Sequence, residues 1–323
     1  NTKAIQRFKR EGEAAGRQQH PNTIAIYDVG EENGIYYIVQ ELVPNGHNLR
    51  DQIDRLRRST HLPKNHYQDL VRLFIKCTDA LQHAHENGVI HRDIKPANIM
   101  VTTDGIPMIA DFGLALVEDE MALSRTGQFA GTPFYMSPEQ AASHRMGIDN
   151  RSDIFSMGVT LYEALTLTRA FNGDTREQVI EQILLEDPVS PSKLRSRVPV
   201  ELSAICLKAM EKKREHRYQS MTAFTADLQR FLDNEPVLAK PPSTVRLAIK
   251  WARRHPVLAT SGTIAIIALV VVSALLGQLN RKTNALIESG NELTTAIAKS
   301  ESERRRAERA MWDAKRLSLN IRG

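Results

Sequence analysis

The sequence predicts an α+β domain, with a small sheet-rich part before a larger helical part, followed by one apolar helix and one charged helix. Two β-rich runs near the N-terminus are joined by Glu-Glu-Asn-Gly, which is typical of a hairpin turn. From Tyr67 onward, apolar residues recur at intervals of three and four, as on one face of a helix. The 25 residues from Pro256 to Asn280 include no charged side chain.

These patterns divide the chain into four parts. We expect a domain at residues 1–231, a linker at 232–255, a membrane-spanning helix at 256–280 and a helical or weakly coiled-coil segment at 281–323. Within the domain, the sheet-rich part covers about residues 1–43 and the helical part about residues 44–231. The run "RSDIFSMGVTLYEAL" is apolar nearly all round, as expected for a central helix.

Composition narrows the class of protein. The chain has 323 residues and a net charge of +5, but its basic residues are spread along it and concentrate mainly in the C-terminal third. We therefore expect no nucleic-acid binding. The two cysteines, Cys77 and Cys206, lie in helical patterns without ligands at metal spacing, so we expect buried free thiols.

The uncharged run is long enough to cross a membrane, because about 20 apolar residues span the hydrocarbon core as a helix. The alternative is a buried helix of a soluble protein, but such helices seldom reach this length without a polar face. Four basic residues precede the run and two follow it at once, namely Arg246, Lys250, Arg253 and Arg254 against Arg281 and Lys282. The positive-inside rule then places the domain in the cytoplasm, and residues 281–323 outside it, at a cytoplasmic membrane crossed once.

The stretch "HRDIKPAN" carries the chemistry. Asp93 supplies a proton acceptor, Lys95 a mobile positive charge and Asn98 a neutral metal ligand, all from one short loop. Transfer of a phosphoryl group to a hydroxyl needs these three functions. Asp111 follows in Asp-Phe-Gly, and a hairpin between the two motifs would bring Asn98 and Asp111 to one end, near one Mg²⁺ site.

With these two motifs at this distance, the chain resembles the eukaryotic-type Ser/Thr protein kinases of bacteria, over most of residues 1–231. The resemblance implies a two-lobe protein-kinase-like fold. It also implies transfer of the γ-phosphate of ATP to Ser or Thr hydroxyls of protein substrates, with Mg²⁺ as the metal and Mn²⁺ as a second candidate. Homodimers for autophosphorylation in trans are a further expectation of this family.

The resemblance identifies the stretch from His91 to Asn98 as the catalytic loop and assigns roles to its residues. Asp93 would accept or orient the substrate hydroxyl proton, although a loop aspartate can also simply cap a turn. Lys95 would neutralise the transferring phosphate, and Asn98 and Asp111 would hold the metal. Arg92 would pair either with a local carboxylate or with a phosphate on the activation segment, and the family favours the phosphate.

The segment between Asp-Phe-Gly and Ser-Pro-Glu is where such kinases are switched by phosphorylation. Ser124 and Thr126 are the candidates, and we favour Thr126. Thr132, in Gly-Thr-Pro-x-Tyr, resembles the threonine that contacts the catalytic aspartate and lysine.

Three further residues are expected to hold the site in place. By analogy Glu139 would form a buried ion pair with Arg217. Asp153 would cap the central helix, brace the backbone of the catalytic loop, or do both.

The nucleotide-binding part is incomplete in this sequence. Neither a Gly-rich loop nor a strand lysine can be found, and "RFKREGEAAGRQQHPNTI" looks like the αC helix together with the segment after it. Glu11 would be its ion-pair glutamate, with Glu13 as the alternative and an exposed helix glutamate as the plain interpretation. We expect the missing parts to lie before Asn1, which would make this an N-terminally truncated chain that is inactive by itself.

The expected hinge is Glu41-Leu42-Val43, where Glu41 and Val43 would contact the adenine of ATP. Gln40 stands where the family more often has an apolar gatekeeper, which predicts a more polar back of the adenine pocket. His47 and Asn48 replace a Gly-Thr type pair, so substrate and ribose contacts at that point are in doubt.

A pseudokinase is the rival hypothesis: a membrane-anchored scaffold that keeps the fold and works through binding. The joint presence of Asp93, Lys95, Asn98 and Asp111 argues against it, because a scaffold needs none of them. The reading frame upstream of Asn1 would discriminate between the two.

Overall fold

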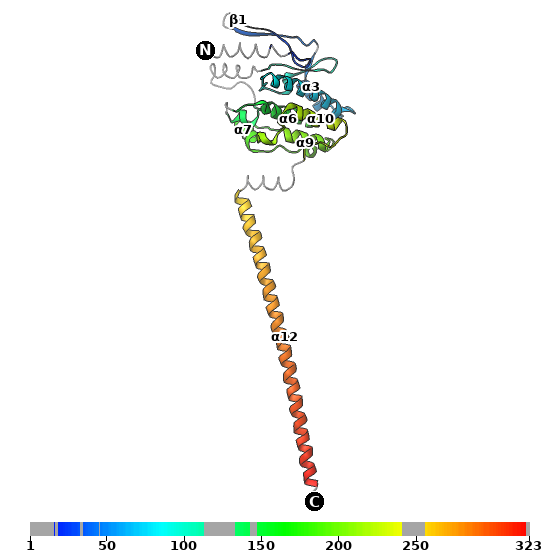
Figure 1. Cartoon of the computed structure of the whole chain (residues 1–323), viewed down its shortest axis with the longest axis vertical. Helices are drawn as coiled ribbons and strands as arrows, with labels where there is room; N and C mark the ends of the chain where they lie inside the picture. The colour runs from blue at the N-terminus through cyan, green and yellow to red at the C-terminus, as the bar shows by residue number, and fades with distance from the viewer. Residues whose placement is uncertain are drawn as a thin grey trace. The chain divides into compact units, whose positions relative to one another are not determined.

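The computed structural model describes residues 16, 19–32, 35–44, 46–112, 133–142, 147–240 and 256–320. The chain forms two compact units, residues 1–242 and 243–323 (Figure 1). In the described ranges, the first unit has two small sheets and a set of helices, and the second contains one long helix.

The first sheet is the hairpin predicted from Glu-Glu-Asn-Gly. Strand β1 (Ile26–Glu32) pairs antiparallel with β2 (Ile35–Gln40), with an irregularity between Ile26 and Asp28. The ring of Tyr37 covers Gly30 so closely that an added Cβ would lie 2.3 Å from it. A side chain at this position would displace the Tyr37 ring, which lies over its cross-strand partner Gly30.

The second sheet carries the catalytic loop at one end. Its strand order is β3 (His47–Asn48), β4 (Ile99–Val101) and β5 (Pro107–Ile109), all antiparallel. The chain before β1 joins this sheet beside β5, because Thr23 forms a parallel bridge with Ile109 and the Asn22 amide donates to the Pro107 carbonyl over 2.8 Å. The sheet therefore ties the hairpin region to the helical part.

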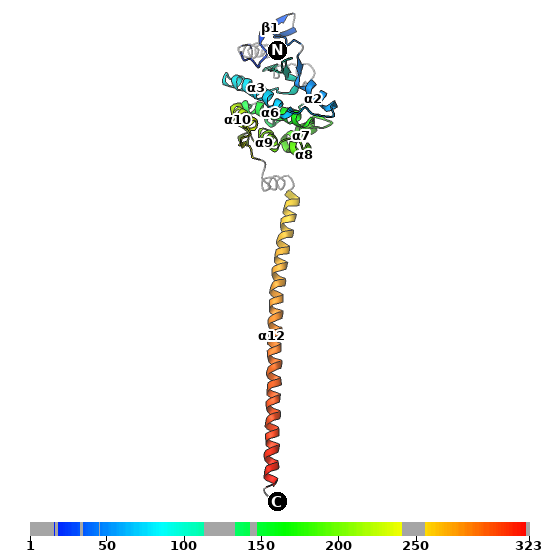
Figure 2. The same cartoon turned by 90° about the vertical axis from the view of Figure 1, so that its right-hand side faces the viewer.

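Among the described residues, the helices and short helical turns of the first unit are α2 (Leu49–Arg58), α3 (His66–Glu86), η1 (Pro96–Asn98), α5 (Pro138–Ala141), α6 (Asn150–Thr166), α7 (Arg176–Leu185), α8 (Pro191–Leu194), α9 (Val200–Ala209), η2 (Arg214–His216) and α10 (Met221–Leu232). Both views place α6 between α3 and α9 (Figure 1, Figure 2). Every residue of α6 from Ser152 to Thr166 is buried, as expected for a central helix. The helical pattern from Tyr67 corresponds to α3, and Cys77 and Cys206 are buried free thiols.

The cap of α6 differs from one sequence expectation. Asp149 is the N-cap, and its Oδ1 accepts a hydrogen bond from the backbone N–H of Arg151 over 2.9 Å. Asp153 lies one turn later, inside the helix and fully buried, so its expected capping role is wrong. Both aspartates fit the capping pattern, but Asp153 makes its contacts with another segment of the chain.

The start of the expected linker packs on the first unit. Leu238 and Ala239 donate their backbone N–H groups to the buried carboxylate of Asp227 on α10, over 2.7 and 2.9 Å. Ala239 is itself buried. The packed part of this unit therefore extends to at least Ala239, beyond the boundary expected at residue 231.

The second unit contains α12 (Pro256–Asn320), a continuous helix of 65 residues. Within the described part of the chain, α12 is the one helix that is long and apolar enough to cross a membrane. The charged segment expected after the span is helical as well, at least as far as Asn320.

Packing of α6 against α9 depends on Gly158. A Cβ at Gly158 would lie 2.8 Å from the Cβ of Ala209. Because interiors are close-packed, Gly158→Val should lower the free energy of unfolding by about 1–3 kcal/mol or more. Urea denaturation followed by circular dichroism would measure this. Gly277→Val on α12, where an added Cβ meets nothing within 4 Å, is the matched control and should leave the transition unchanged.

Candidate active site

Two side chains of the catalytic loop, those of Lys95 and Asn98, converge on the carboxylate of Asp93. Oδ2 of Asp93 accepts from Lys95 Nζ over 2.6 Å and from Asn98 Nδ2 over 3.0 Å. The Asn98 amide also donates to the Asp93 backbone carbonyl over 2.9 Å, which closes the loop on itself. Asn98 is buried, whereas the side chains of Asp93 and Lys95 are each 34% exposed. The loop thus offers a fixed carboxylate and an ammonium group to solvent.

The hairpin of β4 and β5 brings the second motif to the same place. Ala110 donates its backbone N–H to the Asn98 carbonyl over 2.9 Å, and Asp111 follows at once. Asp111 has a φ of 61°, in the left-handed region that a non-glycine residue rarely adopts. Asn98 and Asp111 therefore lie at one end of the hairpin, as the spacing of the two motifs predicted.

Asp153 holds the backbone at the start of the loop. Its Oδ2 accepts from the N–H of His91 over 2.9 Å, and its Oδ1 accepts from the N–H of Arg92 over 2.8 Å. Arg92 has a φ of 68°, a conformation that costs about 1–2 kcal/mol for an L-residue. The predicted contact between Asp153 and the loop backbone is present, and it stabilises this unfavourable turn.

A buried histidine supports Asp153 from α3. His85 Nε2 lies 2.7 Å from Oδ2 of Asp153, and the side chains are 4% and 0% exposed. Burial by itself would raise the pKa of Asp153, but the hydrogen bond from His85 and the two loop amides lower it below its ordinary value. The carboxylate is therefore charged at neutral pH, as an acceptor of several hydrogen bonds must be.

His91 links the two motifs through its ring. Nε2 lies 2.8 Å from the Ala110 carbonyl, so it donates, and Nδ1 accepts the N–H of Asp93 over 3.3 Å. The ring packs against Phe112 with centroids 4.6 Å apart. His91 and Phe112 are both buried, so this contact fixes the catalytic loop against the segment that carries Asp111.

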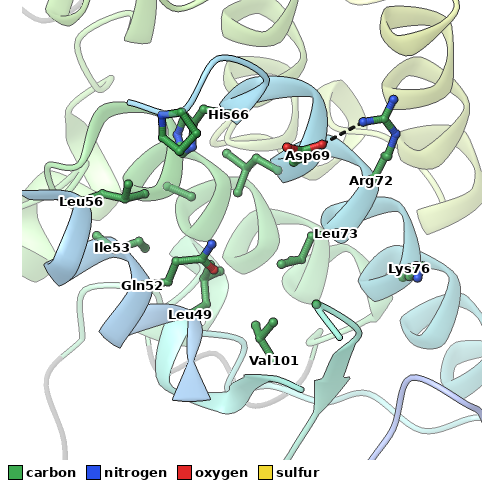
Figure 3. Close-up of a pocket in the computed structure, with 14 residues that line it drawn as sticks. Leu49, Gln52, Ile53, Leu56, His66, Asp69, Arg72, Leu73, Lys76 and Val101 are labelled. Carbon is green, nitrogen blue, oxygen red and sulfur yellow. Dashed lines mark hydrogen bonds and ion pairs between the residues drawn. The ribbon is translucent and has the colours of Figure 1, made fainter. Parts of the chain in front are cut away.

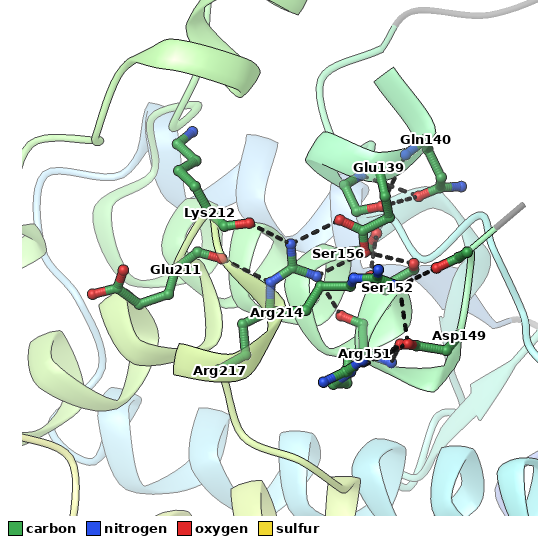
Figure 4. Close-up of polar contacts among 12 residues, drawn as sticks. Glu139, Gln140, Asp149, Arg151, Ser152, Ser156, Glu211, Lys212, Arg214 and Arg217 are labelled. Carbon is green, nitrogen blue, oxygen red and sulfur yellow. Dashed lines mark hydrogen bonds and ion pairs between the residues drawn. The ribbon is translucent and has the colours of Figure 1, made fainter. Parts of the chain in front are cut away.

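Glu139 and Arg217 form the expected buried ion pair (Figure 4). Both guanidinium nitrogens Nη1 and Nη2 lie 2.8 Å from the two carboxylate oxygens. The remaining N–H groups of Arg217 donate to the backbone carbonyls of Glu211, Lys212 and Arg151. All five donors of Arg217 are thus used, which lysine could not reproduce.

Two further contacts connect this pair to the catalytic loop. Ser152 Oγ donates to Oε1 of Glu139 over 2.7 Å, and Ser152 is the neighbour of Asp153 on α6. Gln140 Nε2 donates to the backbone carbonyl of Arg92 over 2.7 Å. Residues 137–142 are therefore attached to the loop as well as to α6. Neither Gln140 nor His85 was expected from the sequence, because their partners lie 48 and 68 residues away and no local pattern marks them.

The expected hinge residues lie between the two sheets. Glu41 donates its backbone N–H to the Ala25 carbonyl over 2.8 Å, and its carboxylate accepts the N–H of Ala25 over 3.3 Å. Val43 follows and is half-buried beside Gly46. Asn48 caps α2 by accepting the N–H of Asp51 over 2.9 Å, so this departure from the family pattern has a structural use.

Several expected site residues lie outside the described residues, so their roles stay predictions. They are Glu11 with its alternative Glu13, Ser124, Thr126 and Thr132.

Asn98 and Asp111 fit a hard cation by their donor chemistry. The side-chain nitrogen Nδ2 of Asn98 donates to Asp93, which leaves the side-chain oxygen Oδ1 of Asn98 to face a metal. Mg²⁺ prefers oxygen ligands and is usually held by one or two protein groups, together with water and substrate phosphates. Among the described residues there is no group of three or more His, Cys, Asp or Glu side chains that would form a complete metal cage. These few protein ligands suit a metal ion that is also bound by the phosphates of a nucleoside triphosphate.

The Glu139–Arg217 pair predicts a pH-dependent stability. Burial by itself would raise the pKa of Glu139, but its hydrogen bonds with Arg217 and Ser152 lower it below its ordinary value. Glu139→Gln should therefore lower the free energy of unfolding by about 3–5 kcal/mol at pH 7, because it leaves a buried guanidinium without its counter-charge.

The direction of this pH dependence follows from the linkage between protonation and folding. A carboxylate with a lowered folded-state pKa contributes stability above its unfolded pKa of about 4.3, and the contribution is lost as pH falls through the folded value. The difference in unfolding free energy between the parent and Glu139→Gln should thus shrink below about pH 4.3. Denaturant titrations at several pH values would measure it, with the exposed Glu181→Gln on α7 as control. A difference that stays constant down to pH 3 would contradict the assigned pair.

Comparison with known proteins agrees with this geometry. Residues 1–229 match the family described as protein kinase domain. The serine/threonine-protein kinase PknB of Mycobacterium leprae is 38% identical over 235 residues, which are 71% of this chain and 36% of that protein. A probable serine/threonine-protein kinase of Streptomyces coelicolor is 38% identical over 237 residues, covering 72% of this chain and 34% of that protein. The chain thus spans about a third of the length of the curated relatives that it matches.

Solved structures share the fold. The crystal structure of the Mycobacterium tuberculosis PknI kinase domain gives a TM-score of 0.55 at 23% identity, covering 71% of this chain and 79% of that chain. At this identity the likeness concerns the fold alone, here a protein-kinase-like fold with few strands in the first lobe and a helical second lobe. The family match, the relatives and the loop geometry agree, and the chain belongs to the protein kinase domain family.

Proposed function

We propose that this chain is part of a membrane-anchored serine/threonine protein kinase that transfers the γ-phosphate of Mg·ATP to hydroxyl groups of protein substrates. The observation that carries the proposal is the convergence of Lys95 and Asn98 on the Asp93 carboxylate. Phosphoryl transfer is catalysed mainly by positioning and by neutralisation of charge, and this loop supplies a group for each.

Asp93 is proposed to orient the substrate hydroxyl. Its Oδ2 is engaged by Lys95 and Asn98, whereas Oδ1 accepts no hydrogen bond from the described residues. Oδ1 is thus available to the incoming O–H group. As the new O–P bond forms, the proton passes to Asp93, and the bond to the leaving oxygen breaks with its electron pair remaining on ADP.

Lys95 is proposed to neutralise the transferring phosphoryl group. Its ammonium group lies beside Asp93 and is one-third exposed, so it can reach a phosphate without losing the carboxylate. Asn98 and Asp111 would hold the metal, which supplies positive charge to the phosphate oxygens when it is bound. Mg²⁺ is the expected ion, and Mn²⁺ has the same preference for oxygen ligands.

Other site assignments rest on the family and remain part of the proposal. Glu11 would pair with a strand lysine, and Glu41 and Val43 would contact adenine. Thr126, or alternatively Ser124, would carry an activating phosphate that Arg92 binds, and Thr132 would contact the catalytic pair. Phosphorylation in trans within a homodimer is the proposed route of activation.

Anchoring in a membrane is proposed from α12. Its isoleucine, leucine and valine residues between Ile264 and Leu279 are each more than half exposed, and the region from Pro256 to Asn280 has no charge. A helix with exposed apolar side chains on all faces is stable in lipid and unfavourable in water. The basic residues that precede it favour a cytoplasmic kinase domain.

The role of Asp93 predicts a loss of activity without a loss of fold. In the complete gene product, Asp93→Asn should lower phosphate incorporation from labelled ATP by about 100-fold or more, because the amide cannot accept the proton. The free energy of unfolding of the variant, measured by thermal denaturation, should stay within about 1 kcal/mol of the parent value, since the side chain is partly exposed. Asp104→Asn, in the exposed turn between β4 and β5, is the matched control. Equal phosphate incorporation by both variants would refute the role, and no incorporation by the parent protein would favour a pseudokinase.

The anchor has a separate test. After cell lysis without detergent, the chain should sediment with the membranes at high speed, resist extraction by sodium carbonate, and dissolve in detergent. A variant with two arginines in the span, Ala268→Arg together with Ala274→Arg, should shift to the supernatant, because charge at the bilayer centre costs about 2.5–3.5 kcal/mol per residue. Recovery of the parent chain in the supernatant would contradict the proposed membrane anchor.

A further inference from the structure

A pocket of about 360 Å³ lies in the helical part of the first unit, lined by residues of α2, α3 and the β4–β5 hairpin (Figure 3). Much of its wall is aliphatic, formed by Leu49, Ile53, Leu56, Leu70, Leu73 and Val101. Sites for small molecules usually have volumes of about 300–1,000 Å³ and apolar walls with a few polar groups. Its lining includes none of the residues assigned to catalysis above.

Two buried polar atoms among the residues that line this pocket have no hydrogen-bond partner in the described part of the protein. They are Oε1 of Gln52 on α2 and Nε2 of His66 at the start of α3. His66 is only 8% exposed. Figure 3 shows the Gln52 amide projecting into the ring of lining residues, with His66 on another side of it. A buried polar atom without a partner costs about 1–3 kcal/mol, so a molecule that satisfies it gains affinity.

The imidazole of His66 presents an acceptor to the pocket. The imidazole donates to the backbone of Ala164, and because Nε2 has no partner we assign this proton to Nδ1. Burial lowers the pKa of His66, which keeps the ring neutral at physiological pH. Nε2 then has a lone pair and no hydrogen, and Gln52 Oε1 is also an acceptor. Both orphaned atoms therefore require a donor from the occupant.

The rim of the pocket has an excess of positive charge. Lys76 and Arg72 line it from α3, and Asp69 pairs with Arg72 over 2.9 Å. Lys76 makes no ion pair with the described residues. An anionic group on the occupant would therefore find a cation at the mouth, while its apolar part fills the interior.

We propose that this pocket binds a small aromatic acid: a ring of indole or phenol size with an N–H or O–H donor for Gln52 or His66, and a carboxylate directed to Lys76. The aliphatic wall accommodates the ring, the orphaned acceptors select for the donor, and the rim selects for negative charge. This site is separate from the proposed phosphoryl transfer, and its readout is binding, so failure of either proposal leaves the other standing.

The ligand series for the test changes one group at a time. The full chain in lipid nanodiscs is titrated calorimetrically with indole-3-acetate, with 1-methylindole-3-acetate, which lacks the ring donor, and with indole, which lacks the carboxylate. Empty nanodiscs provide the reference titration. We expect indole-3-acetate to bind with a Kd at or below about 1 mM, and each altered ligand to bind about 10-fold more weakly.

Protein variants locate the site. Gln52→Leu removes one acceptor at similar volume. His66→Asn removes Nε2 but keeps a donor near the Nδ1 position for Ala164. The penalty for methylating the ring nitrogen should vanish in one of these two variants, which identifies the acceptor. Gln68→Leu, an exposed glutamine on α3, is the matched control, and unfolding curves check that each variant folds.

Three results would overturn the proposal. They are no binding of indole-3-acetate at millimolar concentration, equal affinity for it and its N-methyl analogue, or a methylation penalty that persists in both folded variants. Lys76→Ala gives an independent check, because it should weaken indole-3-acetate and leave indole unchanged. An equal effect on both ligands would contradict the assigned role of the rim.

Discussion

The buried carboxylate of Asp153 is the interaction on which the geometry of the candidate active site depends. Two consecutive backbone amides, those of His91 and Arg92, donate to its two oxygens, and His85 Nε2 lies 2.7 Å from Oδ2 as well. A left-handed turn at Arg92 is unfavourable for a residue with a side chain. The charge-assisted bonds to Asp153 offset this cost and direct the following residue, Asp93, toward Lys95 and Asn98.

Helix α6 also holds the segment that contains Glu139 and Gln140. Ser152 and Asp153 are neighbours at its start, yet Ser152 contacts Glu139 whereas Asp153 contacts the catalytic loop. Glu139 is held in turn by Arg217, whose five donors are all engaged. One helix, buried from Ser152 to Thr166, therefore fixes the positions of two separate segments, and Gln140 connects these segments directly through the Arg92 carbonyl. A substitution that disturbs the start of α6 would therefore displace both the catalytic loop and the segment that contains Glu139.

Local patterns were sufficient to predict the elements that carry the site. The Glu-Glu-Asn-Gly turn gave the first hairpin, the three-and-four spacing gave α3, and the fixed spacing of the two motifs brought Asn98 and Asp111 together. These features depend on nearby residues or on motifs with few alternatives. The Glu139–Arg217 pair was also predicted, but only through the family resemblance, since 78 residues separate the partners.

Contacts between distant segments could not be predicted in the same way. Asp149 and Asp153 both fit a helix cap, and only the tertiary approach of the catalytic loop and His85 distinguishes them. Packing of Leu238 and Ala239 on Asp227 is equally invisible in a proline-containing stretch that looks like a linker. The pocket beside His66 depends on three elements at once, so no single pattern in the sequence indicates it.

Hydrogen exchange at the catalytic loop tests the central role of Asp153 most directly. Peptides covering His91 and Arg92 would be followed by mass spectrometry in the parent protein and in Asp153→Asn, where an amide nitrogen replaces one of the two accepting oxygens. The account predicts strong protection of these two amides in the parent and at least about 10-fold faster exchange in the variant, while the amides of α9 remain protected. Rapid exchange at His91 and Arg92 in the parent, or equal protection in both proteins, would contradict it.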